Sequence, residues 1–167
     1  MRSLLYIGLL LLAGTTAARE APPSSLPAPA VQQQVLELVN QARARGRVCG
    51  AERFGPAAPL VISDKLYRAA RVHARDMARR NYFEHQGRDG RSPKDRVQRE
   101  GYRLLLTGEN IAFGPETAAE VVSGWLGSPG HCANIMDPRF REMGVAVALG
   151  RKRGHFYWVQ ELGNPAS

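Results

Sequence analysis

The two short apolar segments near the C-terminus, residues 144–149 and 156–160, constrain the fold most. A turn of glycine and basic residues, 150–154, separates them, so we expect the two segments to pair as an antiparallel hairpin. The segments upstream have helical spacing instead. Several helices and a short sheet that share one core predict an α+β fold, with the helices covering a small antiparallel sheet.

The expected helices cover residues 31–45, 64–80, 93–100 and 118–126. Apolar residues recur on one face of each longer segment, and Ser or Thr stands where an N-cap is needed. His73 and Trp125 fall on such faces, where we expect core roles for both. Residues 49–59, which carry Gly and Pro, are expected to be irregular, and His155 is expected to be exposed and structural.

The N-terminus is typical of a signal peptide, with Arg2, an apolar run and then small residues. The run has about ten residues, whereas a membrane-spanning helix needs about 20, so we expect no transmembrane segment in the mature chain. An uncleaved anchor is the alternative. The expected organisation is a signal peptide (1–18), a flexible lead-in rich in Pro, Ala and Ser (19–30) and one domain (31–167). The protein is therefore expected in the periplasm or outside the cell.

The chain has two cysteines, Cys49 and Cys132. In an exported protein this number predicts one disulfide, which would join the end of the first helix to the segment around His131. Alternatively, Cys132 is a nucleophile activated by its neighbour His131. We favour the disulfide, because sequence neighbours rarely point at each other productively and a partner cysteine exists.

The formal net charge is +8, and arginine dominates the positive residues. The arginines on expected helix faces are Arg43, Arg45, Arg47, Arg68, Arg71, Arg75, Arg79, Arg80, Arg96 and Arg99. We interpret them as solvated surface residues, with attraction to acidic lipids or cell-wall polymers as the alternative. Nucleic acid is not an expected partner, because no zinc finger and no motif of interleaved aromatic and basic residues is present.

Three residues carry the chemistry of a candidate site: His85, Glu109 and His131, each in a stretch rich in Gly, Pro or Asn. Imidazoles and a carboxylate suit zinc or another divalent ion, although their spacing matches no compact zinc motif. We expect Asn110 to hold the Glu109 carboxylate, and a tight turn at 129–130 to hold His131 at a cavity mouth. The alternative is a hydrogen-bonded cluster that connects three loops without any ligand.

A series of sequence blocks resembles the CAP superfamily, named for cysteine-rich secretory proteins, antigen 5 and pathogenesis-related proteins, whose domain is also called SCP-like. The blocks are Leu38-Val39-Asn40 with Arg43, Leu66 through Ala78, Phe83-Glu84-His85, Gly108-Glu109-Asn110-Ile111-Ala112, Trp125 through Ile135, Met143-Gly144-Val145 and Tyr157-Trp158-Val159-Gln160. The resemblance runs from about Gln34 to Gly163 and is to the compact bacterial type. It implies a three-layer α-β-α sandwich with a central cleft.

In the superfamily, two histidines and two acidic residues line that cleft and can take up a divalent metal. His85, Glu109 and His131 match three of the four positions, and Ser128 stands where the second acid is expected. Zn²⁺ or another divalent cation is therefore expected to bind weakly, unless Glu84, Asp89 or Glu116 replaces that acid. The remaining cleft-lining candidates are Asn110, Ser128 and Asn134.

The function that we favour from the sequence is a non-catalytic, exported ligand-binding module, with a divalent metal, a lipid or a peptide as ligand. No residue is assigned as catalytic. One alternative is a metal-dependent hydrolase or peptidase, in which zinc lowers the pKa of a bound water to about 7. Another is an envelope-associated structural protein that binds anionic polymers, and whose binding falls steeply with salt.

Overall fold

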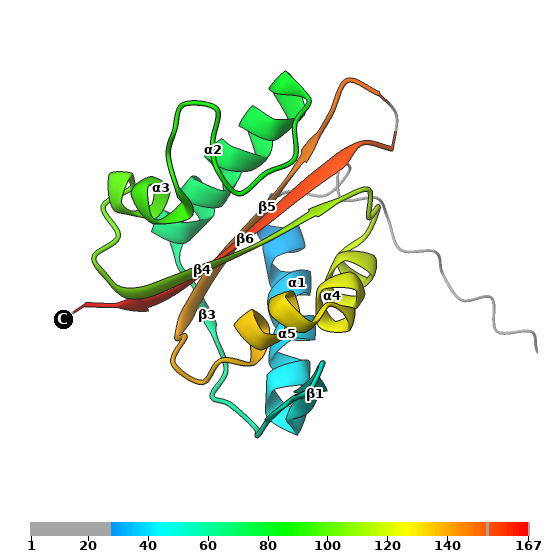
Figure 1. Cartoon of the computed structure of the whole chain (residues 1–167), viewed down its shortest axis with the longest axis vertical. Helices are drawn as coiled ribbons and strands as arrows, with labels where there is room; N and C mark the ends of the chain where they lie inside the picture. Colours follow the sequence, from blue (N-terminus) through cyan, green and yellow to red (C-terminus); the bar gives the residue numbers. More distant parts are fainter. Residues whose placement is uncertain (1–27, 153, 167) are drawn as a thin grey trace, which may run out of the picture.

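The computed structural model describes residues 28–152 and 154–166 (Figure 1). The expected signal peptide and residues 19–27 of the lead-in lie outside the described residues. The elements are α1 (Ala28–Arg45), β1 (Arg47–Cys49), β2 (Glu52–Phe54), β3 (Val61–Ile62), α2 (Asp64–Arg80), α3 (Pro93–Arg99), β4 (Leu104–Phe113), α4 (Ala118–Gly127), α5 (Pro129–Met136), β5 (Glu142–Leu149) and β6 (Phe156–Pro165). Helix α1 thus includes residues 28–30, which the sequence assigned to the lead-in. None of the helices in the described part could cross a membrane.

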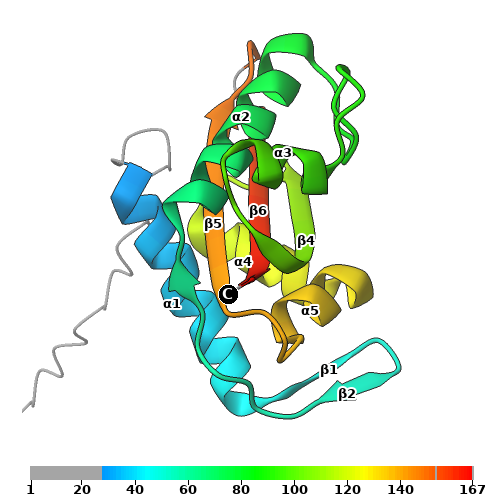
Figure 2. The same ribbon diagram turned by 90° about the vertical axis from the view of Figure 1, so that its left-hand side faces the viewer.

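The elements form three layers around a four-stranded sheet with the strand order β3-β5-β6-β4. Helices α2 and α3 cover one face, while α1, α4 and α5 cover the other (Figures 1 and 2). Strand β6 pairs antiparallel with both β4 and β5, and the two-residue strand β3 adds a parallel pairing to β5. The expected α-β-α sandwich and the antiparallel hairpin of β5 and β6 are therefore confirmed.

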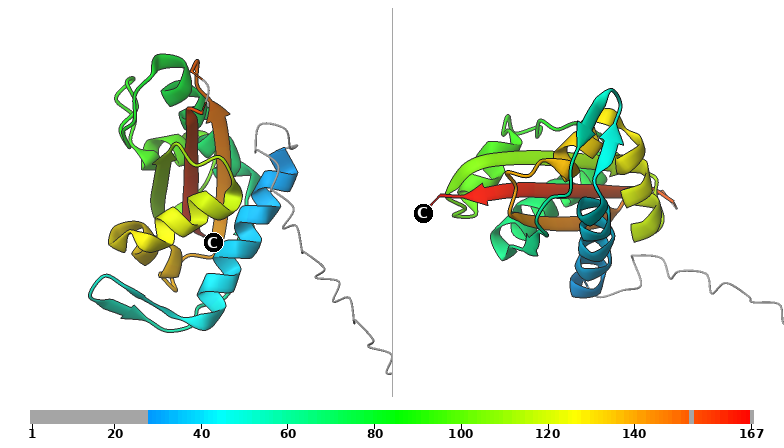
Figure 3. Two further views of the ribbon diagram at one scale, coloured as in Figure 1. Left: turned by 90° about the vertical axis from the view of Figure 1, so that its right-hand side faces the viewer. Right: turned by 90° about the horizontal axis from the view of Figure 1, so that it is seen from below.

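Three segments differ from the expectations. Strand β4 contains Glu109 and Asn110, which we placed in a loop, and it pairs with β6 along almost its whole length. A short hairpin of β1 and β2 extends beyond the layers into the stretch expected to be irregular (Figure 3). The residues expected to form a tight turn at 129–130 begin helix α5 instead, with Pro129 in its first turn. Pro is well suited to that position, because its missing N–H would have no partner there.

Helix α2 lies unusually close to the sheet, because small residues face each other across this contact. Buried alanines Ala70, Ala74 and Ala78 belong to its packed face. At the first turn of α2, Gly144 of β5 leaves no room for a side chain: an added Cβ would lie 2.0 Å from the backbone nitrogen of Tyr67. The distance between α2 and β5 is thus set by the absence of a side chain at this position.

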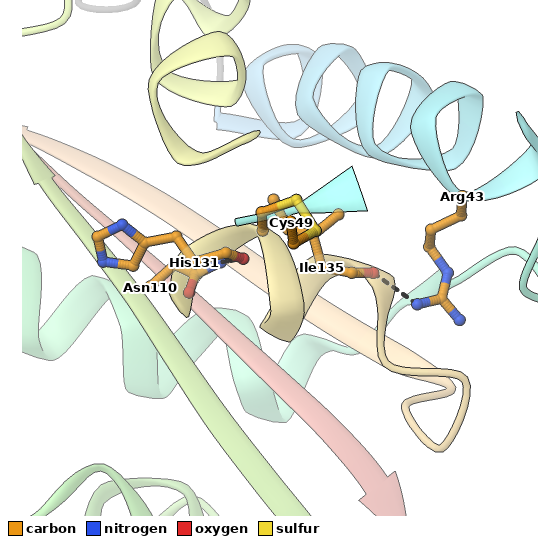
Figure 4. Close-up of a disulfide and its surroundings, with 6 residues drawn as sticks. Arg43, Cys49, Asn110, His131 and Ile135 are labelled. Atoms are coloured by element: carbon orange, nitrogen blue, oxygen red, sulfur yellow. Dashed lines mark hydrogen bonds between the residues drawn. A yellow bond between two sulfur atoms is a disulfide. The ribbon is translucent and has the colours of Figure 1, made fainter. Parts of the chain in front are cut away.

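Arg43 is fully buried in the other layer, at 0 % exposure, so its assignment to a solvated face was wrong. Its guanidinium group donates hydrogen bonds to four backbone carbonyls, those of Ala58 (2.8 Å), Ile135 (2.6 Å), Asp137 (3.0 Å) and Phe140 (3.3 Å). Figure 4 shows the bond to Ile135. These carbonyls lie in loops and at the end of α5, where the regular elements leave them without partners. The side chain therefore holds three parts of the chain together.

Cys49 and Cys132 form a disulfide, as predicted, and the described part of the chain has no free cysteine (Figure 4). The bond joins β1 to α5, which are 83 residues apart in the sequence. Cys132 is therefore not available as a nucleophile. His73 and Trp125 have the expected core roles: the His73 Nε2 donates to the Glu84 carbonyl (2.9 Å), and the Trp125 indole donates to that of Ile111 (3.2 Å).

Candidate functional site

The candidate site is organised around the buried carboxylate of Glu109, whose side chain is only 1 % exposed. One of its oxygens accepts a hydrogen bond from His85 Nδ1 at 2.7 Å, and the other accepts one from the Arg96 guanidinium at 2.5 Å. Since Nδ1 carries the proton in this bond, Nε2 is the ring atom of His85 that is left for a ligand. The His85 side chain is 52 % exposed. A buried carboxylate thus orients an accessible imidazole.

Arg96 fixes this arrangement from helix α3 and is itself buried, with 5 % of its side chain exposed. It also donates to the carbonyls of Arg91 and His85, both at 3.0 Å. Our assignment of Arg96 to a solvated face was therefore wrong, because the charge of Glu109 draws it into the interior. The Ser92–Asp95 capping box begins α3 and so determines where Arg96 lies on the helix.

Glu161 is a second buried carboxyl group, which the sequence analysis missed. It is opposite Glu109 in the pairing of β4 with β6, and its Oε1 lies 3.8 Å from Arg96 Nε. Burial, and then the negative charge of Glu109, raises the pKa of Glu161 well above its ordinary value, while the charge of Arg96 acts in the other direction. Burial and the charge of Glu109 therefore favour the neutral form of Glu161. No local sequence pattern reveals this pair, because it depends on the strand register.

We expect Glu161→Gln to change the pH dependence of stability. Because the pKa of Glu161 is raised by folding, the folded protein binds more protons than the unfolded chain above about pH 4.5. The contribution of this group to the free energy of unfolding then falls as pH rises, by up to about 1.4 kcal/mol per pH unit. Urea unfolding from pH 4 to 8 should show the variant gaining stability relative to the natural protein as pH rises. Parallel pH profiles would contradict a neutral Glu161.

His131 approaches the same site from the first turn of α5 and is half-buried. Burial, and then the charge of a protonated His85, lowers the pKa of His131, which favours a neutral imidazole. Its backbone carbonyl accepts a hydrogen bond from Asn110 Nδ2 at 3.3 Å, and both residues appear in Figure 4. Asn110 therefore positions the His131 segment, and not the Glu109 carboxylate as we expected.

The other cleft-lining candidates have different positions. Asn110 is fully buried, so it does not face an open cleft; it donates to Gln160 Oε1 and accepts from Asn134 Nδ2, both at 2.9 Å. Asn134 is half-buried in this same network. Ser128 is the N-cap residue of α5, is half-buried and makes no capping hydrogen bond with its side chain. Ser128 and Asn134 remain accessible in part.

Glu109 is poorly placed to act as a third metal ligand beside the two histidines. Among residues 28–152 and 154–166, no group of three or more His, Cys, Asp or Glu side chains is arranged to hold a metal ion. Both Glu109 oxygens already accept hydrogen bonds, and the Arg96 charge balances the carboxylate. Asp89, one alternative for the missing acid, pairs with Arg91. A cation would therefore rely on His85 and His131.

Two exposed aromatic side chains lie close to each other, and one of them, Phe83, is two residues before His85 in the sequence. Phe83 and Phe113 are each 44 % exposed, and their ring centroids are 6.2 Å apart. Phe113 also packs against His155 and Tyr157, with a distance of 4.9 Å between ring centroids in both pairs. His155, which we expected to be exposed, is thus half-buried against Phe113. Exposed aromatic rings beside polar groups are typical of ligand-binding surfaces.

This three-layer sandwich defines a class of protein already represented among solved structures. An extracellular protein containing an SCP domain from Bacillus anthracis has a TM-score of 0.68 and 27 % identity, over 82 % of this chain and 41 % of that one. NaASP2, solved with Zn²⁺, has a TM-score of 0.60 over 86 % of this chain and 84 % of that one. Its identity is 15 %, so this second likeness shows the fold alone.

The chain belongs to the cysteine-rich secretory protein (CAP) family, whose family model matches residues 36–162. The resemblance proposed from the sequence blocks is therefore confirmed. The uncharacterized protein YkwD of Bacillus subtilis is 36 % identical over 140 residues, which cover 84 % of this chain and 49 % of that protein. The chain thus spans less than half the length of this relative and of the B. anthracis structure.

Proposed function

We propose that this protein is an exported, non-catalytic binding module that takes up a divalent transition metal through His85 and His131. The main support for this proposal is the hydrogen bond from His85 Nδ1 to the buried Glu109 carboxylate, at 2.7 Å. A carboxylate behind a histidine fixes its tautomer and increases the basicity of the other nitrogen, as in many metal sites. The lowered pKa of His131 also favours metal binding, because only a neutral imidazole can bind a metal ion.

The exposed rings of Phe83 and Phe113 support a ligand with an apolar part, such as a peptide or a lipid. A two-histidine site leaves several coordination positions, which polar groups of such a ligand could fill. The metal would then connect the protein to its ligand. Export is supported by the disulfide and by the signal-peptide pattern at the N-terminus.

A hydrolase is less well supported, because the two buried carboxyl groups of the site, Glu109 and Glu161, are poorly suited to act as a general base. Glu109 accepts hydrogen bonds on both oxygens, and the burial of Glu161 favours its neutral form. A general base must reach the proton that it removes, so a fully buried acid does not meet this need.

Calorimetric titration of zinc into the metal-stripped protein tests the proposal. We expect saturable binding in the natural protein and its loss, by at least about tenfold in affinity, in His85→Ala/His131→Ala. His155→Ala is the matched control, because it removes a histidine outside the pair and should bind zinc as the natural protein does. Glu109 is a poor choice for substitution, since its loss would also leave the buried Arg96 charge without a partner. Absence of saturable binding, or equal binding by the double variant, would overturn the proposal.

A further inference from the structure

A cavity of about 380 Å³ lies between α2, α3 and the turn that precedes α3. Small-molecule sites typically have volumes of about 300–1,000 Å³, so this cavity is large enough for one. Figures 1 and 2 show the two helices side by side on one face of the sheet. The charged residues that line the cavity are Arg75, Arg79, Arg91, Arg96 and Arg99, together with Asp76, Asp89 and Glu100.

The acidic side chains on this wall already have partners within the protein. Asp76 pairs with Arg80 and accepts from the Tyr82 hydroxyl, Asp89 pairs with Arg91, and Glu100 pairs with Arg68. Among the arginines of the wall, Arg96 pairs with Glu109. These pairs balance most of the local charge.

Three arginines of the cavity wall have no such partner. Within the described ranges, Arg75, Arg79 and Arg99 form no ion pair with any carboxylate. Arg75 and Arg79 are one turn apart on α2, and Arg99 is in the last turn of α3. Arg75 and Arg79 lie on one helix face and repel each other, because the acids of this wall are paired with other groups; an anion in the cavity would reduce this repulsion.

The arrangement favours a phosphoryl group over a single carboxylate. A phosphate monoester carries a charge of about −1.5 to −2 and three strong acceptor oxygens, so it can bind guanidinium groups from two helices at once. A carboxylate has one charge and two oxygens. Ala69 and Val72 also line the cavity and provide an apolar wall for the carbon part of a phosphate ester.

We propose that the cavity between α2 and α3 binds the phosphoryl group of an anionic ligand through Arg75, Arg79 and Arg99. None of these arginines belongs to the proposed metal site, so each proposal can be tested independently of the other. The site is also distinct from a diffuse attraction to the +8 charge of the chain, because it depends on three particular side chains.

Titration of inorganic phosphate at constant ionic strength tests this proposal with two charge-matched triple variants. Arg75→Gln/Arg79→Gln/Arg99→Gln should lose more than about tenfold in phosphate affinity. Arg45→Gln/Arg47→Gln/Arg53→Gln removes the same charge from exposed positions at the other end of the molecule, and should stay within about twofold of the natural protein. Zinc binding should be unchanged in both triples, and phosphate binding should persist in His85→Ala/His131→Ala.

Vesicles distinguish the source of the phosphoryl group. Cosedimentation with phosphatidylglycerol vesicles that is lost only in the cavity triple, and that inorganic phosphate competes away, would assign a lipid headgroup. Phosphate binding without cosedimentation would assign a soluble phosphate ester. Equal losses in the two triples, or no saturable phosphate binding below about 10 mM, would overturn the proposal.

Discussion

Gly144→Ala should destabilise the protein by at least about 4 kcal/mol, a loss that few single substitutions cause. The added Cβ would lie 2.0 Å from the backbone nitrogen of Tyr67 and 2.4 Å from the carbonyl carbon of Leu66. Both atoms belong to the main chain of helix α2, so no side-chain rotation relieves the clash and the helix must move from the sheet. Because domains are stable by only about 5–15 kcal/mol, we expect a midpoint of urea unfolding close to zero or an unfolded protein.

Gly124→Ala is the matched control. Gly124 is inside α4, and an added Cβ there would meet nothing within 4 Å. Alanine favours a helix over glycine by about 0.5–1 kcal/mol, so this variant should be slightly more stable. A small effect of Gly144→Ala, comparable in size to that of Gly124→Ala, would contradict the close packing of α2 on β5.

Arg43→Ala should lower the free energy of unfolding by about 3–5 kcal/mol. The substitution leaves the carbonyls of Ala58, Ile135, Asp137 and Phe140 without the donor that they share, and it opens a cavity. Urea unfolding at neutral pH measures the loss. Arg43→Met separates its causes, because methionine fills much of the space and restores none of the hydrogen bonds.

Arg45→Ala is the control for this experiment, since Arg45 is exposed near the end of the same helix. We expect its effect to stay within about 0.5 kcal/mol. If Arg43→Ala cost no more than Arg45→Ala, then the four hydrogen bonds of Arg43 would contribute little. If Arg43→Met were as stable as the natural protein, the contribution would come from packing alone.

Most of the fold could be predicted from the sequence, because most of its helices and strands have a recognisable local sequence pattern. Helical spacing and caps predict α2, α3 and α4, and the apolar pair of segments around the basic turn predicts β5 and β6. Strand β4 could not be predicted in this way, since Gly108 and Asn110 have low strand propensity. Its pairing with β6 decides its structure, and that contact connects residues about 50 positions apart.

The sequence proposed residues for the candidate site, but it did not reveal the hydrogen bonds and ion pairs that hold them. His85, Glu109 and His131 were proposed from residue type, context and the resemblance, and the structure shows the contact of His85 with Glu109. Arg96 and Glu161 were missed because their roles depend on burial, which neither sequence position reveals. An arginine on a helix is usually solvated, and only the buried Glu109 makes this one an exception.

Helix α5 is held to the rest of the protein at three successive points. Asn110 holds the carbonyl of His131 at its start, the disulfide holds Cys132, and Arg43 holds the carbonyl of Ile135 near its end. If His131 binds the proposed metal, its backbone loses little conformational entropy, because folding has already ordered it. The imidazole of His85 lies on a loop and is half-exposed, but Glu109 orients its ring and Arg96 holds its backbone carbonyl. Both imidazoles of the proposed pair are therefore ordered by folding before any ligand arrives.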